Sequence, residues 1–188
     1  MKKTAIIGLF ILLSACSWRS PNAEFYVMNS QGLSEISARK LNIAVARVKV
    51  PDMLDRAQMV VYDKDSDKVN ILEFNRWVEV LPDILQSTIT NDLIAYLPNA
   101  YIKNTYFDST QMQYSVNVEI NRIAAYKGDK VILSAWWNIT NAGGYVLRRE
   151  QVSYEIKVKG DSISDLVEAQ SEAVHQLSKA IAEQLAKM

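Results

Sequence analysis

The chain has 188 residues, of which 21 are Lys or Arg and 21 are Asp or Glu, so its formal net charge is zero. This length predicts one domain, and a composition that is 49% hydrophobic and 22% charged is that of a globular protein rather than a disordered one. The balanced charge argues against nucleic acid as a partner. A single Cys and a single His exclude an internal disulfide, a Cys-based zinc site and a cluster of His ligands.

Residues 1–15 have the pattern of a secretory signal peptide. Two lysines follow Met1, and the apolar run AIIGLFILL from Ala5 to Leu13 spans nine residues, whereas a membrane-spanning helix needs about 20. The run therefore predicts a leader that is removed from the mature protein rather than a permanent anchor.

The end of this leader, Leu13-Ser14-Ala15-Cys16, resembles the lipobox of bacterial lipoproteins. Small residues before the cut fit a peptidase cleft, and the thiol of Cys16 is the nucleophile that takes a diacylglycerol. The resemblance implies a lipid anchor at Cys16 in a Gram-negative envelope; the alternative is an ordinary secretory signal in which Cys16 is incidental. In such lipoproteins an Asp after the Cys favours retention in the inner membrane, so Ser17 implies the outer membrane.

Residues 16–23 are predicted to form the lipidated N-terminus and a tether, and residues 24–188 a single domain. The seven residues of the tether, 17–23, reach at most about 25 Å when fully extended. The folded domain is therefore expected to stay close to the membrane that holds the anchor.

Most of the domain shows the alternation of apolar and polar residues that is typical of strands. The predicted strands are 24–28, 41–50, 58–63, 69–74, 101–107, 114–124, 131–140 and 145–158. In the second strand the apolar positions change parity between Val45 and Val48, which predicts a β-bulge before Pro51 ends the strand. The third and fourth strands flank a polar turn and are predicted to form a hairpin.

Two segments have helical spacing of their apolar residues. The first is Glu79–Leu97, with Pro82 in its first turn, and the second is Ile163–Lys187, with Ser162 and an acid three residues later as a capping box. Hairpins dominate, and no alternation of strand, helix and parallel strand is evident. The predicted fold class is therefore α+β, a mainly antiparallel sheet with two long helices packed on one face.

Motifs of catalysis are missing from the sequence. It has no Gly-rich phosphate loop and no Gly-x-Ser-x-Gly nucleophile elbow. His175 lies beside apolar residues of the last predicted helix and is expected to be a structural or surface residue. The acidic turn DKDSDK at 63–68 lacks the Gly and the Glu that an EF-hand needs at its sixth and twelfth positions. We expect no enzyme activity, no catalytic residue, no metal site and no cofactor.

Several longer motifs accompany the lipobox. They are VPDMLDRAQMV at 50–60, RWVE at 76–79, a strand-turn-strand unit that ends in AWW at 135–137, and the C-terminal helix. Together they resemble the ABC-type transport auxiliary lipoproteins, the group of paraquat-inducible protein C. One departure is that the family often has Pro directly after the Glu, whereas here Val80 follows Glu79 and the proline is Pro82, which shifts the expected helix start by one or two residues.

This resemblance implies a non-catalytic subunit of an MCE-type, ABC-associated intermembrane lipid transport system. Such a lipoprotein sits at the periplasmic face of the outer membrane as a homo-oligomeric ring. It docks the far end of a PqiB-like periplasmic tunnel protein, which works with an inner-membrane permease. One alternative is a stand-alone periplasmic lipid-binding chaperone, which needs an apolar cavity inside the domain. An envelope enzyme would need a cleft whose carboxyl groups have pKa values pushed apart.

Five residues are candidates for contact with a partner: Met53, Leu54, Arg56, Trp136 and Trp137. The first three belong to the segment Pro51–Arg56, in which apolar residues stand between charges; the alternative is that Met53 and Leu54 plug the sheet edge. Adjacent strand residues point to opposite faces, so one tryptophan ring is expected in the core. The other is expected either under a helix or in an exposed contact patch. Trp77 is expected in the core.

Overall fold

The computed structural model describes residues 21–30, 34–37, 39–66, 68–104 and 112–188. The signal peptide, Cys16 and Ser17 lie outside the described residues. The elements in chain order are β1 (Glu24–Tyr26), β2 (Asn42–Val45), the short 3₁₀ helix η2 (Asp52–Leu54), β3 (Gln58–Tyr62), β4 (Val69–Trp77), α2 (Leu81–Tyr96), β5 (Tyr101–Asn104), β6 (Tyr114–Ala125), β7 (Lys130–Asn141), β8 (Val146–Lys157) and α3 (Ile163–Leu185).

These elements confirm the predicted α+β class and most strand and helix positions within a few residues, but the strand predicted over 41–50 is shorter, because β2 ends at Val45. β3 and β4 form the predicted antiparallel hairpin, and β6, β7 and β8 form an antiparallel meander. Of the strand predicted over 101–107, the part from 105 lies outside the described residues.

The strands form two sheets rather than the single sheet that was predicted. A five-stranded sheet has the order β5-β2-β6-β7-β8, and a three-stranded sheet has the order β1-β4-β3. β2 is parallel to both of its neighbours, and β1 is parallel to β4. The expectation that no parallel crossover occurs is therefore wrong, because α2 lies between the parallel neighbours β2 and β5 along the chain. The alternation of apolar and polar residues within a strand indicates which face is buried. It does not indicate whether a partner strand that is distant in the sequence runs parallel or antiparallel.

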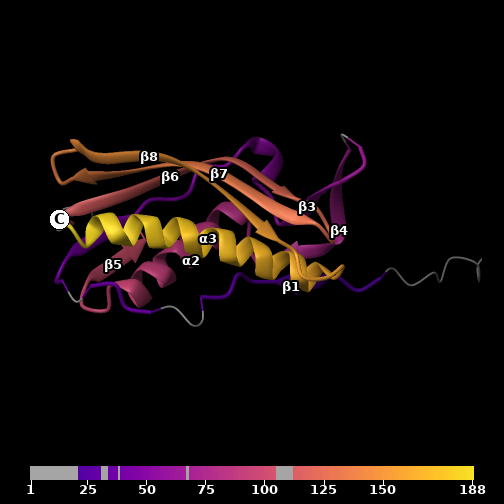
Figure 1. Ribbon diagram of the computed structural model, residues 1–188, viewed down its shortest axis with the longest axis horizontal. Helices are drawn as coiled ribbons and strands as arrows, with labels where there is room; N and C mark the ends of the chain where they lie inside the picture. The colour runs from indigo at the N-terminus through magenta and orange to yellow at the C-terminus, as the bar shows by residue number, and fades with distance from the viewer. Residues whose placement is uncertain (1–20, 31–33, 38, 67, 105–111) are drawn as a thin grey trace, which may run out of the picture.

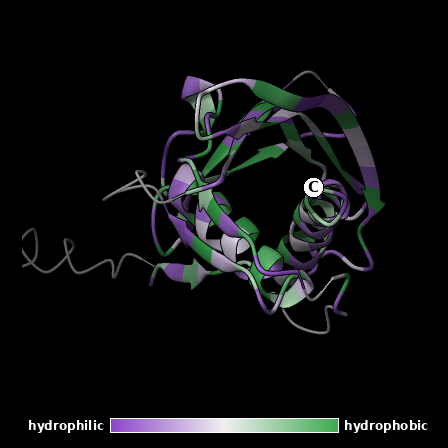
Figure 2. Cartoon of the chain, turned by 90° about the vertical axis from the view of Figure 1, so that its left-hand side faces the viewer, coloured by the Kyte–Doolittle hydropathy of each residue, from purple (hydrophilic) through white to green (hydrophobic). Residues whose placement is uncertain are grey.

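Both helices pack on one face of the five-stranded sheet, as predicted. α3 lies against β7 and β8, α2 lies against β2 and β5, and the two helices contact each other. Viewed along the long axis of the molecule, the sheets arch around the helices (Figure 2). The largest side chains that are fully buried come from both layers and include Ile43, Leu85, Ile89, Trp137 and Leu177. Each such side chain contributes roughly 1.5–3 kcal/mol by leaving water.

The predicted bulge occurs where β2 ends. Val45 pairs with Val116, and the next bridge on the same pair of strands joins Lys49 to Glu119, so four residues on one strand oppose three on the other. The extra residue bends the chain away from the ladder. The carbonyl of Val45 accepts a hydrogen bond of 2.8 Å from the buried side-chain amide of Gln86 on α2. This bond ties the helix to the point at which the strand is interrupted.

The capping box predicted for the last helix is present. The hydroxyl of Ser162 accepts a hydrogen bond of 3.0 Å from the backbone N–H of Asp165, and the Asp165 carboxylate accepts one of 3.0 Å from the backbone N–H of Ser162. These hydrogen bonds to Ser162 hold the pKa of Asp165 below its usual value. They also satisfy two donors that a helix start leaves without partners.

Replacing Ser162 with alanine is expected to lower the free energy of unfolding by about 1 kcal/mol, because one capped N–H of α3 loses its acceptor. Urea unfolding of the Ser162→Ala and Ser164→Ala variants measures this. Ser164 lies within the first turn of the same helix, so its variant is the control. An equal loss in the two variants would contradict a capping role for Ser162.

Candidate partner-docking surface

Trp136 stands on the outward face of the five-stranded sheet, which is the face away from the helices. It is paired across the sheet with Glu119 on β6 and Gln151 on β8, and it is 41% exposed. The next row is Asn117, Asn138 and Arg149, in which the Asn117 amide donates to the Asn138 side-chain oxygen at 3.2 Å. A large aromatic side chain is thus presented to solvent by rigid strands and surrounded by polar groups.

A hollow of about 520 Å³ lies beside this ring, and we call it the Trp136 groove. Its lining combines the exposed ring of Trp136 with residues, mostly polar, of β6, β7, β8 and the bulged segment after β2: Ala46, Arg47, Lys49, Asn117, Val118, Glu119, Trp136, Trp137, Asn138 and Arg149. Three of these residues are basic and one is acidic. Tryptophan and arginine together are the residue types that dominate binding energy at protein interfaces, so the groove has the composition of a docking site.

Arg47 connects the Trp136 groove to the segment Pro51–Arg56. Its Nε atom donates to Asp83 at the start of α2 at 2.8 Å, and its guanidinium lies 3.5 Å from the carboxylate of Asp55. Arg47 also lines a neighbouring hollow of about 410 Å³ together with Asp55. Exposed ion pairs of this kind contribute little stability, so their main effect is to fix the position of Arg47 between the two surfaces.

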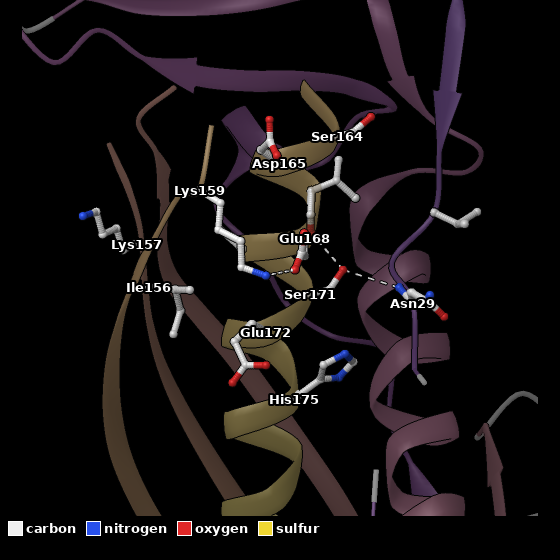
Figure 3. A pocket seen from close by; sticks show the side chains of 13 residues that line it. Asn29, Ile156, Lys157, Lys159, Ser164, Asp165, Glu168, Ser171, Glu172 and His175 are labelled. Carbon is white, nitrogen blue, oxygen red and sulfur yellow. Dashed lines mark hydrogen bonds and ion pairs between the residues drawn. The ribbon is translucent and has the colours of Figure 1, made fainter. Parts of the chain in front are cut away.

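A second hollow, of about 620 Å³, lies on the outer side of α3 between the end of β8 and the segment after β1 (Figure 3). Its lining is mostly polar or charged: Val27, Asn29, Ile156, Lys157, Lys159, Ser164, Asp165, Val167, Glu168, Ala169, Ser171, Glu172 and His175. Lys159 pairs with Glu168, and this hydrogen bond raises the pKa of Lys159. The Ser171 hydroxyl accepts from the backbone N–H of Asn29 at 3.4 Å.

His175 forms a pair with Asp92 where α3 meets α2, at the wall of this second hollow. The His175 Nδ1 atom lies 2.8 Å from a carboxylate oxygen of Asp92, and the two side chains are 12% and 0% exposed. The other Asp92 oxygen has no hydrogen-bond partner among the described residues. Burial raises the pKa of the neighbouring Tyr96 to about 12, with a further contribution from Asp92. The prediction that His175 is structural is consistent with this position.

Sequence reasoning missed the role of Asp92. It lies three residues after Ile89 and four before Tyr96, so it belongs to the apolar stripe of α2, and all three are buried. An acid on an apolar stripe needs a partner when it is buried. The one histidine of the chain stands on the stripe of the other long helix and could have been named as that partner.

The His175–Asp92 pair is expected to stabilise the protein more at pH 5.5 than at pH 9. Burial lowers the pKa of His175, but the hydrogen bond and the charge of Asp92, with the Asn29 backbone and Glu172, outweigh burial, so the pKa is raised from 6.5. A group whose pKa is raised by folding contributes stability that is fully present below the unfolded pKa and is lost as pH rises through the folded pKa. The neighbouring Tyr96, whose pKa is raised to about 12, keeps its proton throughout this range.

Urea unfolding of the protein and of its His175→Gln variant at both pH values measures this effect. Because the chain has one histidine, the difference in unfolding free energy between the two proteins is expected to shrink as the pH rises. A difference that is constant or grows with pH would show that protonation of His175 does not stabilise the fold.

Residues 26–182 match the family model described as the ABC-type transport auxiliary lipoprotein component. The chain belongs to this family. No curated protein matches the auxiliary lipoprotein. Membership makes it a lipoprotein component of a transport system in the cell envelope, which is a non-enzymatic role.

Crystal structures of other proteins share the fold of the auxiliary lipoprotein. A protein described as uncharacterised has a TM-score of 0.72 and 21% identity, over 88% of this chain and 99% of that chain. A Xanthomonas campestris protein of the DUF330 family has a TM-score of 0.72 and 9% identity, over 85% of this chain and 93% of that chain. At these identities the likeness concerns the fold.

The five predicted contact residues of the auxiliary lipoprotein differ from one another in exposure. Met53 and Trp136 are exposed, whereas Leu54 and Trp137 are buried and therefore unavailable to a partner on this surface. Arg56 is half-buried, and its Nε atom has no hydrogen-bond partner among the described residues. The two tryptophans point to opposite faces, as predicted, and Trp77 is in the core, as predicted.

Metal-binding clusters and membrane-spanning helices are both absent from the described residues. No group of three or more His, Cys, Asp or Glu side chains there could hold a metal ion. None of the helices there is long and apolar enough to cross a bilayer.

Proposed function

We propose that this auxiliary lipoprotein is anchored to the outer membrane through Cys16 and docks an MCE-type periplasmic tunnel protein there. The observation that carries the proposal is the family match over residues 26–182, which joins a lipoprotein to an ABC-type transport system. The lipobox at residues 13–16 supplies an attachment point directly before the domain. A PqiB-like tunnel protein, served by an inner-membrane permease, is the proposed partner.

The Trp136 groove and Met53 are the proposed contacts with the tunnel protein. Trp136 and Met53 are exposed, and Arg47 connects their two surfaces through Asp55 and Asp83. Rigid strands hold the tryptophan, so little side-chain freedom is lost when a partner covers it. Arg149 and Lys49 at the groove favour a partner surface that carries carboxylates. We also propose that several copies form a ring around the end of the tunnel.

Capture from crosslinked envelopes tests this function. The intact, tagged lipoprotein is expected to retain an MCE-type protein, and the Trp136→Ala variant is expected to retain much less of it. Gln151→Ala is the matched control, because Gln151 is exposed and lies beside Trp136 in the sheet. Capture without any MCE-type protein would overturn the proposal. Light scattering of the non-lipidated protein tests the ring, which fails if only monomers are found.

A stand-alone lipid chaperone receives less support. It would hold an acyl chain in an apolar cavity, whereas nine of the thirteen residues that line the 620 Å³ hollow beside α3 are charged or polar. Mass spectrometry of the non-lipidated domain distinguishes the two functions. Stoichiometric lipid in the purified domain would favour the chaperone.

A further inference from the structure

Four exposed apolar side chains lie together on β1, β4 and the residues that follow them. They are Phe25, Val27, Phe74 and Val78, and we call them the end patch. Phe25 is 61% exposed, which is unusual for a phenylalanine in a folded protein. None of the four lines the Trp136 groove. Exposed apolar patches mark surfaces that meet another apolar phase.

The register of β1 against β4 places these side chains on one face. Tyr26 pairs with Trp77, and both point inward to the core. Phe25 pairs with Arg76, so this pair points outward. Because side chains alternate along a strand, Val78, two residues after Arg76, shares its face. Phe74 is exposed two residues before Arg76, at the point where the register of β4 against β3 shifts. Val27 shares the face of Phe25, and the burial of the next residue, Met28, agrees with this alternation.

The end patch lies at the end of the molecule where the first strand, β1, is located. Phe25 of this strand lies nine positions after Cys16 along the chain, a span of about 30 Å at most. β1, β3 and β4 lie at one end of the long axis, and the C-terminus lies at the other (Figure 1). An anchor at Cys16 therefore holds the end patch within reach of the membrane surface at all times.

We propose that the end patch rests in the interfacial region of the leaflet that holds the anchor, so that the domain meets the lipid surface in one fixed orientation. The inference rests on the anchor in the proposed function. Aromatic and aliphatic side chains that are exposed on a protein surface and held near a bilayer partition into the interface between headgroups and acyl chains. A short tether makes this contact intramolecular, so that even weak partitioning is sufficient. Arg76 stands among the four, and Glu73 partners its guanidinium at 3.6 Å.

Site-specific fluorescence on the full lipoprotein tests this orientation. Lipidation consumes the only Cys of the chain, so a cysteine introduced by Phe25→Cys or Val78→Cys is the only free thiol and can carry an environment-sensitive dye. The control is Tyr145→Cys, because Tyr145 is 74% exposed and precedes β8 at the opposite end of the molecule. The labelled proteins are reconstituted into phosphatidylethanolamine and phosphatidylglycerol vesicles, with and without doxyl-labelled lipid.

Dyes at positions 25 and 78 are expected to shift to the blue and to lose most of their emission to the doxyl lipid, whereas the dye at 145 keeps its emission. Equal quenching at the two ends, or no quenching at either, would overturn the proposal. A blue shift without lipid quenching would assign the end patch to a protein contact instead. Flotation of the vesicles reports the anchor separately: protein that fails to float refutes the anchor, whereas protein that floats with a water-exposed dye at 25 refutes only the end patch.

Discussion

Replacing Cys16 with alanine is expected to abolish palmitate labelling and to release the protein from membranes. The thiol is the only sulfur nucleophile in the chain, so no second residue can take the diacylglycerol. Each acyl CH₂ buried in the bilayer contributes about 0.8 kcal/mol, and two chains already give stable attachment. Without them, the end patch alone would have to hold the domain. Metabolic labelling and fractionation of envelopes measure both losses.

A second substitution separates lipidation from the choice of membrane. Ser17→Asp leaves the thiol and the residues before the cut unchanged, so labelling is expected to persist while the protein moves to the inner-membrane fraction. Labelling that continues in Cys16→Ala would show that the lipobox interpretation is wrong. A labelled Ser17→Asp protein that is found equally in both membranes would leave the anchor intact. It would contradict the outer-membrane assignment, because that assignment rests on the residue after Cys16.

The proposed anchor and the proposed docking surface involve different parts of the molecule. β1 enters the fold at the end that carries the end patch, and the β7–β8 hairpin extends to the other end (Figure 1). The Trp136 groove faces outward from β6, β7 and β8, and the end patch does not contribute to it. A domain whose first strand rests on lipid could therefore offer the groove to a partner that approaches from the periplasm.

The burial pattern of each element could be predicted from the sequence because it depends on neighbouring residues. The change of parity between Val45 and Val48 predicts the bulge, and Ser162 predicts the start of α3. The pairing of β1 with β4 could not be predicted. β1 has three residues, and its parallel partner follows about 50 residues later. Nothing local to Glu24–Tyr26 specifies such a partner.

The candidate site was predictable to the same limited extent. Alternation places Trp136 and Trp137 on opposite faces but does not say which face the helices cover. That choice depends on the partners across the sheet, which place Trp137 with the buried Val118. The exposure of Phe25 could not be predicted for a similar reason, because an apolar residue in a strand is usually buried. Only the parallel register with Arg76 turns it outward.

Replacing Trp137 with alanine is expected to lower the free energy of unfolding by about 3–5 kcal/mol, which is the usual cost of removing a buried aromatic side chain. Trp137 is fully buried between β6, β8 and the helices. For a domain of this size the loss corresponds to a Tm lower by roughly 10 °C. Trp137→Phe is expected to cost clearly less, because a ring remains and the buried indole N–H has no hydrogen-bond partner among the described residues.

The neighbouring substitution Trp136→Ala is expected to change the unfolding free energy by no more than about 1 kcal/mol, because its side chain is on the outward face of the sheet and is 41% exposed. Urea unfolding of the non-lipidated variants measures stability, and envelope capture measures docking. Trp137 is therefore expected to stabilise the core, and Trp136 to contact the partner. The Trp137→Phe variant should still bind the tunnel protein, whereas the Trp136→Ala variant should remain folded but no longer bind it. Loss of capture in proportion to lost stability, in whichever variant, would contradict a specific contact at Trp136.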